Sequence, residues 1–530
     1  MKRRPGCASV RNGRANPVET LESRRLFSAI TFGPPAHYLA GTVGTPPGRG
    51  AEHVAVGDFN GDGAADLVVA GNDVTVTPAV RHSVRVLLNR GDGTFAPPSE
   101  PAPAGTNLSG LAVGDFNRDG RLDAVVCDDQ EEAMVYVLLG EGDGTFEPAR
   151  AFHSGSRSQD LAVADFNRDG TLDVAVANAR EWAPFGTRQL PMHQGALLFG
   201  NGDGTFRREQ PIFTGRRPQH FVEAGDVNGD GHIDTVFGQV VIGPGDFAAP
   251  ESRVFASIAF LDVPVRQPTT VPAAITGLKL ADLNGDGRLD VAASANRDLM
   301  SGGGVAVTLA GRGDGTFADP LLWEPGAVRL VDVDVADFNA DGRPDLALAG
   351  DDPRFMRPTP VPAVITLENL GGDAYSRPSF FFFGGNNYPG GLAVGRLNRD
   401  RLPDVALALP ETNQVGVRLN TTRTLTATGV RLRGTAGVPI TAQVARFNVT
   451  GPVTGVESFN ATIYWGDGMR PTAGSIVVNE DGSFGVPGTH TYRRAGLYRV
   501  LVVIRWPEAQ LSRMVTSSAL VTWPRVGATS

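Results

Sequence analysis

The residues best suited to chemistry in this chain lie in short acidic segments. The first runs from Asp58 to Asp66, with oxygen-bearing side chains at its positions 1, 3, 5 and 9 and Gly63 at position 6. This spacing lets a short loop turn its oxygens inward around one hard cation, with the carbonyl of position 7 as a further ligand. The glycine permits the sharp bend. Because all the ligands are oxygens, the segment predicts a calcium loop.

The segment is repeated along the chain at spacings of 50 to 61 residues. An active site is normally needed once, so a role needed about seven times indicates a repeated supersecondary unit. Six copies are complete, and a weakened seventh runs from Arg396 to Asp404. The predicted ligands of about six calcium sites are Asp58, Asn60, Asp62, Ala64, Asp66, Asp115, Asn117, Asp119, Arg121, Asp123, Asp165, Asn167, Asp169, Thr171, Asp173, Asp226, Asn228, Asp230, His232, Asp234, Asp282, Asn284, Asp286, Arg288, Asp290, Asp337, Asn339, Asp341, Arg343 and Asp345, where position 7 contributes its carbonyl.

The alternatives to this kind of calcium loop are an EF-hand and a plain turn. An EF-hand needs a glutamate at position 12 and flanking helices, but position 12 is apolar in all six copies and short β-type runs flank each segment. A plain turn of Asp, Asn and Gly needs no metal. The aspartate at position 9, kept in all seven copies, favours metal. In the seventh copy Arg396 replaces the first aspartate and Arg401 the glycine, so no metal is expected there.

Catalysis by these carboxylates is not expected. Glycoside hydrolysis needs two carboxyl groups held across a substrate, one of them with a raised pKa. Carboxylates turned onto one cation stay ionised instead. No nucleophile, zinc or phosphate-loop motif remains unassigned elsewhere in the sequence.

A second motif, GDGTF, alternates with the acidic segments at 91–95, 142–146, 202–206 and 313–317. Apolar strands precede it, which predicts a tight hairpin turn whose phenylalanine packs at the start of the next strand. Two copies spell Arg-Gly-Asp, the tripeptide that integrins recognise. Glu or Asn takes the arginine place in the other two copies, which favours a solvated turn.

A unit of apolar strand, D-x-N-x-D-G-x-x-D, apolar strand and a strand ending in GDGTF resembles the FG-GAP repeat, also called VCBS, of integrin α-subunit heads and bacterial surface proteins. The resemblance covers residues 31–421, and seven copies match the seven blades of that family's β-propeller. It implies a ring of four-stranded sheets, with calcium loops on one face and partner binding usually on the other.

One such unit cannot bury both faces of its own sheet. When the units stack and close into a ring, neighbouring sheets cover both faces of each sheet. We expect residues 31–38 to pair with strands near 415–419. The run Phe380 to Phe383 is predicted to lie in the core. Two interruptions, 181–194 and 240–272, lack the motif and are expected on one rim, either as a partner surface or as surface padding.

The last hundred residues change pattern. The segments Trp465-Gly466-Asp467-Gly468, His490-Thr491-Tyr492 and 495–500 resemble a PKD-type immunoglobulin-like sandwich, in which the WGDG turn packs on the following strands. For His490 a core or hairpin contact is expected rather than catalysis. The predicted class is all-β, with a leader (1–30), a seven-bladed β-propeller (31–421) and an immunoglobulin-like β-sandwich (422–530).

Composition bounds the remaining questions. The net charge of −9 is local, because the six complete segments hold 18 carboxylates, and it indicates no nucleic-acid partner. Neither cysteine forms part of a disulfide framework, and Cys127 is expected in the core. No apolar run reaches the roughly 20 residues of a membrane helix. The basic start, with LESRRLFSA, resembles the LEPR-XLL leader of bacterial surface proteins.

The sequence thus predicts a calcium-binding, non-enzymatic protein that is exported to the bacterial cell surface or exterior, where a monomer binds a protein or glycan ligand. The alternative is an extracellular enzyme that acts on polysaccharide or phosphoester in the central cleft of the propeller, since fold does not fix function.

Overall fold

A computed structural model of the chain describes residues 30–41, 50–72, 82–179, 195–207, 209–212, 218–243, 246–257, 268–298, 302–326, 329–351, 361–372, 374–385, 388–450, 453, 455–509 and 511–524. Within these ranges the protein consists of β-strands and two short 3-10 helices, η1 (Val456–Ser458) and η2 (Pro507–Ala509). The all-β class is confirmed. No helix in these ranges has the length and apolar character needed to cross a membrane.

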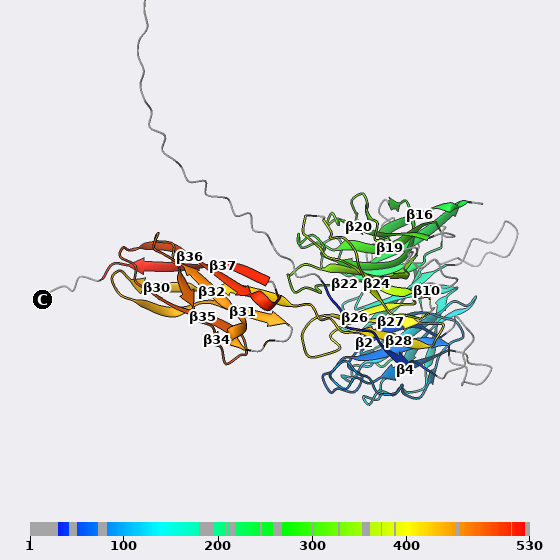
Figure 1. Cartoon of the computed structure of the whole chain (residues 1–530). Helices are drawn as coiled ribbons and strands as arrows, with labels where there is room; N and C mark the ends of the chain where they lie inside the picture. Colours follow the sequence, from blue (N-terminus) through cyan, green and yellow to red (C-terminus); the bar gives the residue numbers. More distant parts are fainter. Residues whose placement is uncertain are drawn as a thin grey trace, which may run out of the picture.

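The first 28 strands form seven antiparallel sheets of four strands each within the described residues (Figure 1). The first sheet holds β2 (Ala51–Gly57), β3 (Asp66–Asn72), β4 (His82–Leu87) and β5 (Ala102–Pro103). The second holds β6 (Leu108–Gly114), β7 (Asp123–Asp128), β8 (Ala133–Leu138) and β9 (Arg150–Gly155). The third holds β10 (Ser158–Ala164), β11 (Asp173–Asn178), β12 (Gly195–Leu198) and β13 (Gln210–Ile212). The fourth holds β14 (Phe221–Gly225), β15 (Asp234–Gly243), β16 (Asp246–Ser257) and β17 (Thr269–Val271).

The remaining three sheets follow in chain order, except that the last borrows the first strand of the chain. The fifth holds β18 (Ala274–Ala281), β19 (Asp290–Asp298), β20 (Gly302–Leu309) and β21 (Leu321–Trp323). The sixth holds β22 (Leu330–Ala336), β23 (Asp345–Asp351), β24 (Pro362–Leu367) and β25 (Ser379–Phe382). The seventh holds β26 (Leu392–Gly395), β27 (Asp404–Leu409), β28 (Gln414–Arg418) and β1 (Ala36–Leu39).

Each sheet is an up-and-down meander whose second strand continues after its leading aspartate as a largely apolar, largely buried run, and β7, β11 and β27 are buried along their whole length. Continuous apolar runs fit strands that are covered on both faces. The hydrophobic clusters are shared between neighbouring sheets, so that one contains Val68 with Leu138 of the next sheet, and another contains Val69 with Val415 of the last. Each sheet therefore completes its core only by stacking on its neighbours.

The seven sheets close into a ring. The first strand of each sheet contacts the first strand of the next, and β26 contacts β2, which completes the cycle. The seventh sheet is finished by β1, which pairs antiparallel with β28 in the register Ala36↔Val417 to Leu39↔Gln414. The predicted pairing of residues 31–38 with residues near 415–419 is confirmed. Repeated four-stranded sheets around a centre make the fold β-propeller-like.

The GDGTF segments form the predicted hairpin turns. Each turn consists of the GDGTF residues and the one residue before them. The residue that precedes the turn forms an isolated β-bridge with the phenylalanine of the motif, as Asn89 does with Phe95 and Gly311 with Phe317. A fifth turn of the same kind, Asn369↔Tyr375, lacks the GDGTF letters. In the first turn Asp92 Oδ1 accepts bonds from the backbone and hydroxyl of Thr94, and Arg90 Nη1 donates to Phe95 O at 2.8 Å. The charged groups of this Arg-Gly-Asp are thus engaged within the turn.

Two expectations differ from the structure. Phe380, Phe381 and Phe382 are half-buried and only Phe383 is fully buried, because β25 is the outermost strand of its sheet. The segment 240–272 is not padding throughout, since β15 and β16 extend their hairpin as far as the pair Gly243↔Asp246. Residues 181–194, and all of the leader except Ile30, lie outside the described residues.

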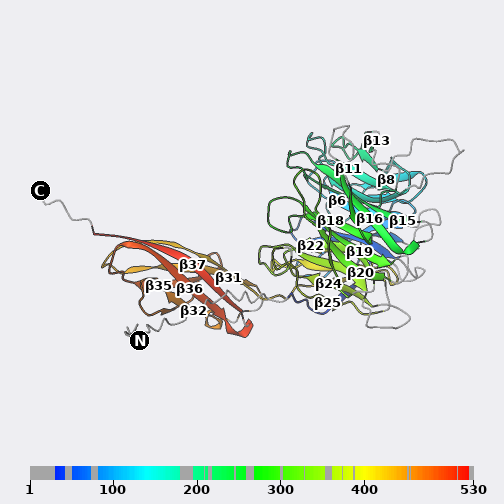
Figure 2. The same ribbon diagram turned by 90° about the horizontal axis from the view of Figure 1, so that it is seen from above.

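From Thr424 onward the chain forms two further sheets, which Figures 1 and 2 show as an elongated lobe beside the ring. One has the order β29-β31-β35-β34 and the other β30-β37-β36-β32-β33. Their shared core contains the buried Trp465, Tyr492 and Trp506. The strands are β29 (Thr424–Gly429), β30 (Arg431–Thr435), β31 (Ile440–Thr450), β32 (Asn460–Tyr464), β33 (Thr472–Gly474), β34 (Val477–Val478), β35 (Phe484–His490), β36 (Gly496–Trp506) and β37 (Leu511–Thr522).

Candidate metal centre

The seven acidic segments, named loops 1 to 7 in chain order, connect the first and second strands of the seven sheets. Loop 1 (58–66) begins directly after β2 ends at Gly57, and its position 9 is the first residue of β3. The other loops begin at residues 115, 165, 226, 282, 337 and 396. Each loop needs left-handed backbone at position 6, which Gly63 supplies with φ +82°. The structure thus places the segments as strand connectors, as the sequence predicts.

The first three oxygen-bearing positions lie together at the tip of the loop. In loop 1, Asp58 Oδ1 accepts the N–H of Gly61 at 2.8 Å and its Oδ2 accepts the N–H of Gly63 at 2.9 Å. Asn60 Nδ2 donates to Asp62 Oδ2 at 2.9 Å. The N–H of position 7 donates to the position 5 carboxylate in all six complete loops, at 2.8 to 3.0 Å. These bonds orient the oxygens of positions 1, 3 and 5 around the same turn.

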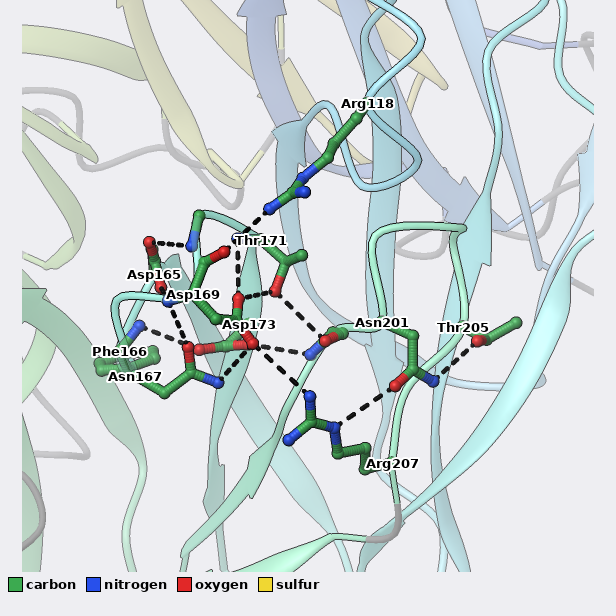
Figure 3. Close-up of polar contacts among 12 residues, drawn as sticks. Arg118, Asp165, Phe166, Asn167, Asp169, Thr171, Asp173, Asn201, Thr205 and Arg207 are labelled. Atoms are coloured by element: carbon green, nitrogen blue, oxygen red, sulfur yellow. Dashed lines mark hydrogen bonds and ion pairs between the residues drawn. The ribbon is translucent and has the colours of Figure 1, made fainter.

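Loop 3 shows how neighbouring arginines enter this arrangement (Figure 3). Arg118, from position 4 of loop 2, donates to the carbonyl of Asp169 at 3.1 Å. Arg207, from the turn after β12, lies 3.6 Å from the Asp169 carboxylate. Thr171 bonds the same carboxylate through its hydroxyl and its N–H. Positive charge therefore reaches the rim of this loop from two directions.

Position 9 is separate from the exposed tip. Asp66 is fully buried, and it accepts the N–H of Phe59 on Oδ2 at 2.9 Å and the N–H of Asn89 on Oδ1 at 2.7 Å. The bond to the N–H of position 2 is present in all seven loops. A bond from the second residue after the third strand is present in loops 1, 2, 3, 5, 6 and 7. In these six loops the position 9 aspartate therefore ties the loop to the end of the third strand of its own sheet.

This bonding gives the recurrence of Asp at position 9 a structural cause. Asp404 makes both bonds in loop 7, where Arg396 replaces the first carboxylate. The recurrence does not by itself distinguish a metal loop from a turn. The residues that donate the second bond were not predicted; they are Asn89, Gly140, Gly200, Gly311, Asn369 and Asn420. Their shared signal is a Gly or Asn at the second position after the third strand.

Crowding of carboxylates shows in the titration of position 9. Burial raises the pKa of Asp66, Asp123 and Asp173 to about 6, and repulsion from the carboxylate at position 5 adds to this. Burial likewise raises the pKa of Asp345 to about 8. A divalent cation among these carboxylates would relieve the repulsion.

The six complete loops differ in whether an arginine side chain pairs with their tip carboxylates. Asp119 lies 3.8 Å from Arg121, and Asp341 is paired with the neighbouring Arg343. No ion pair within 4 Å involves the tip carboxylates of loops 1, 4 and 5 among the described residues. Loop 6 also leaves Asn339 Nδ2 buried without a partner in the described part of the chain.

The donor set fits a hard cation by its chemistry. Across the described ranges, no group of three or more His, Cys, Asp or Glu side chains is placed so as to hold a metal ion. Each complete loop instead combines the carboxylates of positions 1 and 5 with an asparagine amide and a buried third carboxylate at position 9. Every oxygen here is a hard donor, and one that accepts a single N–H keeps a second lone pair for a cation. Calcium at these loops stays a prediction.

A second charged cluster, not predicted from the sequence, lies on four consecutive first strands. Lys279 Nζ lies 2.5 Å from Glu223 Oε1, while Asp160, Asp332 and Asp334 flank this pair. Each aspartate accepts a backbone N–H from a neighbouring first strand or the segment before it, as Asp160 does from Val222 at 3.1 Å. Burial raises the pKa of Asp160 to about 7 and that of Asp332 to about 6.

The aromatic trio of the last hundred residues packs as expected. His490 Nε2 lies 2.8 Å from Asp467 Oδ2, and its ring stacks on Trp465 with centroids 4.7 Å apart. Tyr492 donates its hydroxyl to the carbonyl of Trp465 at 3.0 Å. These contacts join the WGDG turn to β35 and confirm a structural contact for His490. The predicted core position of Cys127 is confirmed as well.

Comparison with known proteins bears on the repeats and the fold. Residues 71–126, 125–176 and 282–348 match the model of the FG-GAP-like repeat. No curated protein matches the chain. Solved structures similar to this chain include a mutant NanB sialidase from Streptococcus pneumoniae (11% identity, 70% of this chain and 68% of that chain, TM-score 0.37) and AofleA from Arthrobotrys oligospora (11%, 68% and 94%, 0.35). A Synechocystis apocarotenoid oxygenase is 10% identical over 73% of this chain and 90% of that chain, with a TM-score of 0.37.

At these TM-scores the solved structures carry no conclusion about activity. The repeat matches include loops 2, 3, 5 and 6, and the sheet topology extends the same unit around the ring. The chain therefore contains FG-GAP-like repeats, built on repeated four-stranded sheets of a β-propeller-like fold.

Proposed function

We propose that this protein is a calcium-binding, non-enzymatic binding protein of the bacterial cell surface or exterior. In this proposal residues 31–421 form a seven-bladed β-propeller, residues 422–530 a PKD-type immunoglobulin-like sandwich, and residues 1–30 a leader. The observation that supports calcium most strongly is the shared geometry of the loop tips. Six loops direct carboxylate and amide oxygens to one turn, and the tip carboxylates of three of them form no ion pair within 4 Å among the described residues.

In each complete loop the cation would be held by the side chains of positions 1, 3, 5 and 9 and by the carbonyl of position 7. When bound, calcium supplies charge neutralisation and a cross-link within the loop. The protein supplies the rest. The position 9 aspartate fixes the start of the second strand, and left-handed residues at positions 4 and 6, such as Gly285 and Gly287, fold the tip. The cation therefore has a structural role, stabilising successive sheets of the ring.

Thermal unfolding with and without calcium tests this role. Because a ligand that binds only the folded state stabilises it by mass action, EDTA should lower the melting temperature in steps and calcium should restore it. Asp115→Ala or Asp165→Ala should weaken one site and leave the ring folded, since each repeat contacts only its neighbours. Asp143→Ala, in an exposed turn outside the loops, is the control. A melting temperature that ignores EDTA and calcium would contradict the proposal.

Adhesion to a protein or glycan, by a monomeric chain, is the proposed use of this scaffold. The extended hairpin of β15 and β16 supports a partner surface on one rim, because it continues beyond the length of the neighbouring hairpins. Binding of the intact protein to glycan arrays and to cells separates adhesion from a purely structural scaffold. A chain that binds neither would contradict the adhesive role.

The second charged cluster, around Lys279 and Glu223, is the observation that favours the enzymatic alternative. Asp160 has a raised pKa and faces Lys279 and Glu223, as a hydrolase of polysaccharide or phosphoester would need. However, Asp160, Asp332 and Asp334 each spend both oxygens on backbone N–H groups, which supports a structural role. Turnover of such substrates that is abolished by Asp160→Asn and spared by Asp115→Ala would favour the enzyme.

A further inference from the structure

The closure seam of the ring, between the seventh and first sheets, contains a cluster of arginines. Loop 7 lies next to loop 1 and to the turn after β4, and the three segments line a hollow of about 390 Å3. Its charged lining consists of Arg90, Arg396, Arg399 and Asp62. A second hollow, of about 340 Å3, lies between the fifth and sixth sheets, and its charged lining consists of one arginine and two aspartates, Arg312, Asp290 and Asp319. The closure seam therefore has a local excess of positive charge.

The positive charge comes from loop 7 itself. Arg396 stands where the six complete loops have their first aspartate, and Arg399 stands at position 4. Arg399 reaches across the seam, since a Cβ built on Gly91 would lie 3.3 Å from its Nη2 atom. Among the described residues, Arg396 and Arg399 have no carboxylate within ion-pair distance. Two guanidinium groups are thus available to an anion from outside.

The base of the hollow is rigid. Asn89 Nδ2 donates to Leu397 O of loop 7 and to Ala65 O of loop 1, each at 2.7 Å. Arg90 is held by its bond to Phe95 O. Loops 1 and 7, which flank the hollow, are therefore held at a fixed spacing. A fixed spacing lowers the entropy cost of positioning a ligand.

We propose that this hollow binds a carboxylate-bearing sugar, such as a uronic acid residue of an acidic polysaccharide. Planar guanidinium groups recognise a carboxylate through paired hydrogen bonds. The Asp62 carboxylate, on the opposite wall, is an acceptor for hydroxyl groups and disfavours an anion that has none to donate. The volume lies in the range of small-molecule pockets. A ligand with one carboxylate and several hydroxyls matches all three features.

The inference rests on the arginines of loop 7 and not on cation binding, so it can fail while the calcium proposal holds. The test is a titration of the full chain with sodium D-glucuronate, followed by calorimetry and by saturation-transfer NMR in buffer with EDTA. D-glucose, the same ring without the carboxylate, and sodium sulfate, an anion without the ring, are the control ligands. Arg377→Ala removes an exposed arginine outside the hollow and is the control variant.

Glucuronate should bind the unmodified chain and the Arg377→Ala variant alike, and glucose should give no signal. Arg396→Ala and Arg399→Ala should each weaken binding about tenfold or more, because each removes a charge-assisted contact. Arg396→Asp, which restores the carboxylate of the complete loops, should abolish it. Thermal unfolding verifies that these exposed substitutions leave the fold intact. The proposal would be overturned if glucuronate did not bind, or if the Arg396→Ala and Arg377→Ala variants bound it equally well. It would also be overturned if sulfate bound as tightly as glucuronate.

Discussion

The Oδ2 atom of Asp404 accepts the backbone N–H of Leu397 at 2.8 Å in a loop whose first carboxylate has become an arginine. The second oxygen of Asp404 accepts the N–H of Asn420 at 2.7 Å. The same pair of bonds occurs at position 9 of loops 1, 2, 3, 5 and 6, for which we propose a bound cation. In these loops a buried aspartate organises the sheet, while the loop tip has the proposed role of binding a metal.

Replacement of Asp404 tests the first function without any metal. Asp404→Ala leaves two buried N–H groups unpaired, and each costs about 1 to 3 kcal/mol. We expect the free energy of unfolding to fall by about 2 to 4 kcal/mol in denaturant titration, with or without calcium. Asp143→Ala, in an exposed turn, should cost under about 1 kcal/mol. Equal effects of the two substitutions would contradict the structural role of position 9.

The backbone of Arg401 supplies a second prediction. Its φ is +72°, a left-handed conformation that costs a residue with a Cβ about 1 to 2 kcal/mol. Arg401→Gly should therefore stabilise the chain by about 0.5 to 1 kcal/mol. The converse change, Gly120→Ala, lies at φ +83° with no atom near the new Cβ and should destabilise by a similar amount. Denaturant midpoints measure both, and a loss of stability in Arg401→Gly would contradict the assignment of strain.

The interior aspartates predict a dependence on pH. The pKa of Asp160 is raised to about 7, chiefly by burial and in part by Glu223, although the N–H of Val222 and Lys279 lower it. Because the folded-state pKa is raised, the stability due to Asp160 is present below pH 4 and is lost as the pH rises to about 7. Asp160→Asn removes the charge and one of the two acceptors of backbone N–H groups, so its melting temperature relative to that of the unmodified chain should rise by about 1 to 3 °C between pH 4 and pH 8. A difference in melting temperature that does not change with pH would contradict this prediction.

Arginine pairing predicts unequal calcium sites. Arg343 pairs with Asp341 at the tip of loop 6 and also donates to Asn369 O at 2.8 Å. Arg343→Gln should free this carboxylate and raise the calcium affinity of loop 6 about tenfold, since one opposing charge of order 1.4 kcal/mol is removed. Arg288→Gln at the same position of loop 5, where Arg288 has no ion pair among the described residues, is the matched control. Equal calorimetric titrations of the two variants would refute unequal pairing.

Much of the fold could be predicted from the sequence, because the sequence patterns that indicate it are local and repeated. The alternation of apolar strands with the acidic and GDGTF segments predicted the four-stranded unit, and repetition predicted closure through residues 31–38. The turn at 369–375 was missed because Tyr375 and the glycines before it keep the geometry while the letters change. The run at 380–383 was placed too deep, since sequence does not show which strand lies at the outer edge.

The candidate site was less readable, because bonds between distant segments decide it. Asp66 pairs with Asn89, which is 23 residues away, and Asn89 in turn pairs with Leu397 across 308 residues. The interior charges lie on separate first strands, where only the curvature of the ring brings Asp160 and Lys279 together. Such contacts depend on the closed ring and leave no local pattern in the chain.

Calcium uptake tests the central claim most directly. The chain is stripped with EDTA, dialysed against metal-free buffer and titrated with calcium by calorimetry while thermal unfolding is followed in parallel. We predict uptake of about six ions per chain and a rise in melting temperature on saturation. Absence of calcium uptake, with an unchanged melting temperature, would contradict the assignment of the six loops as cation sites.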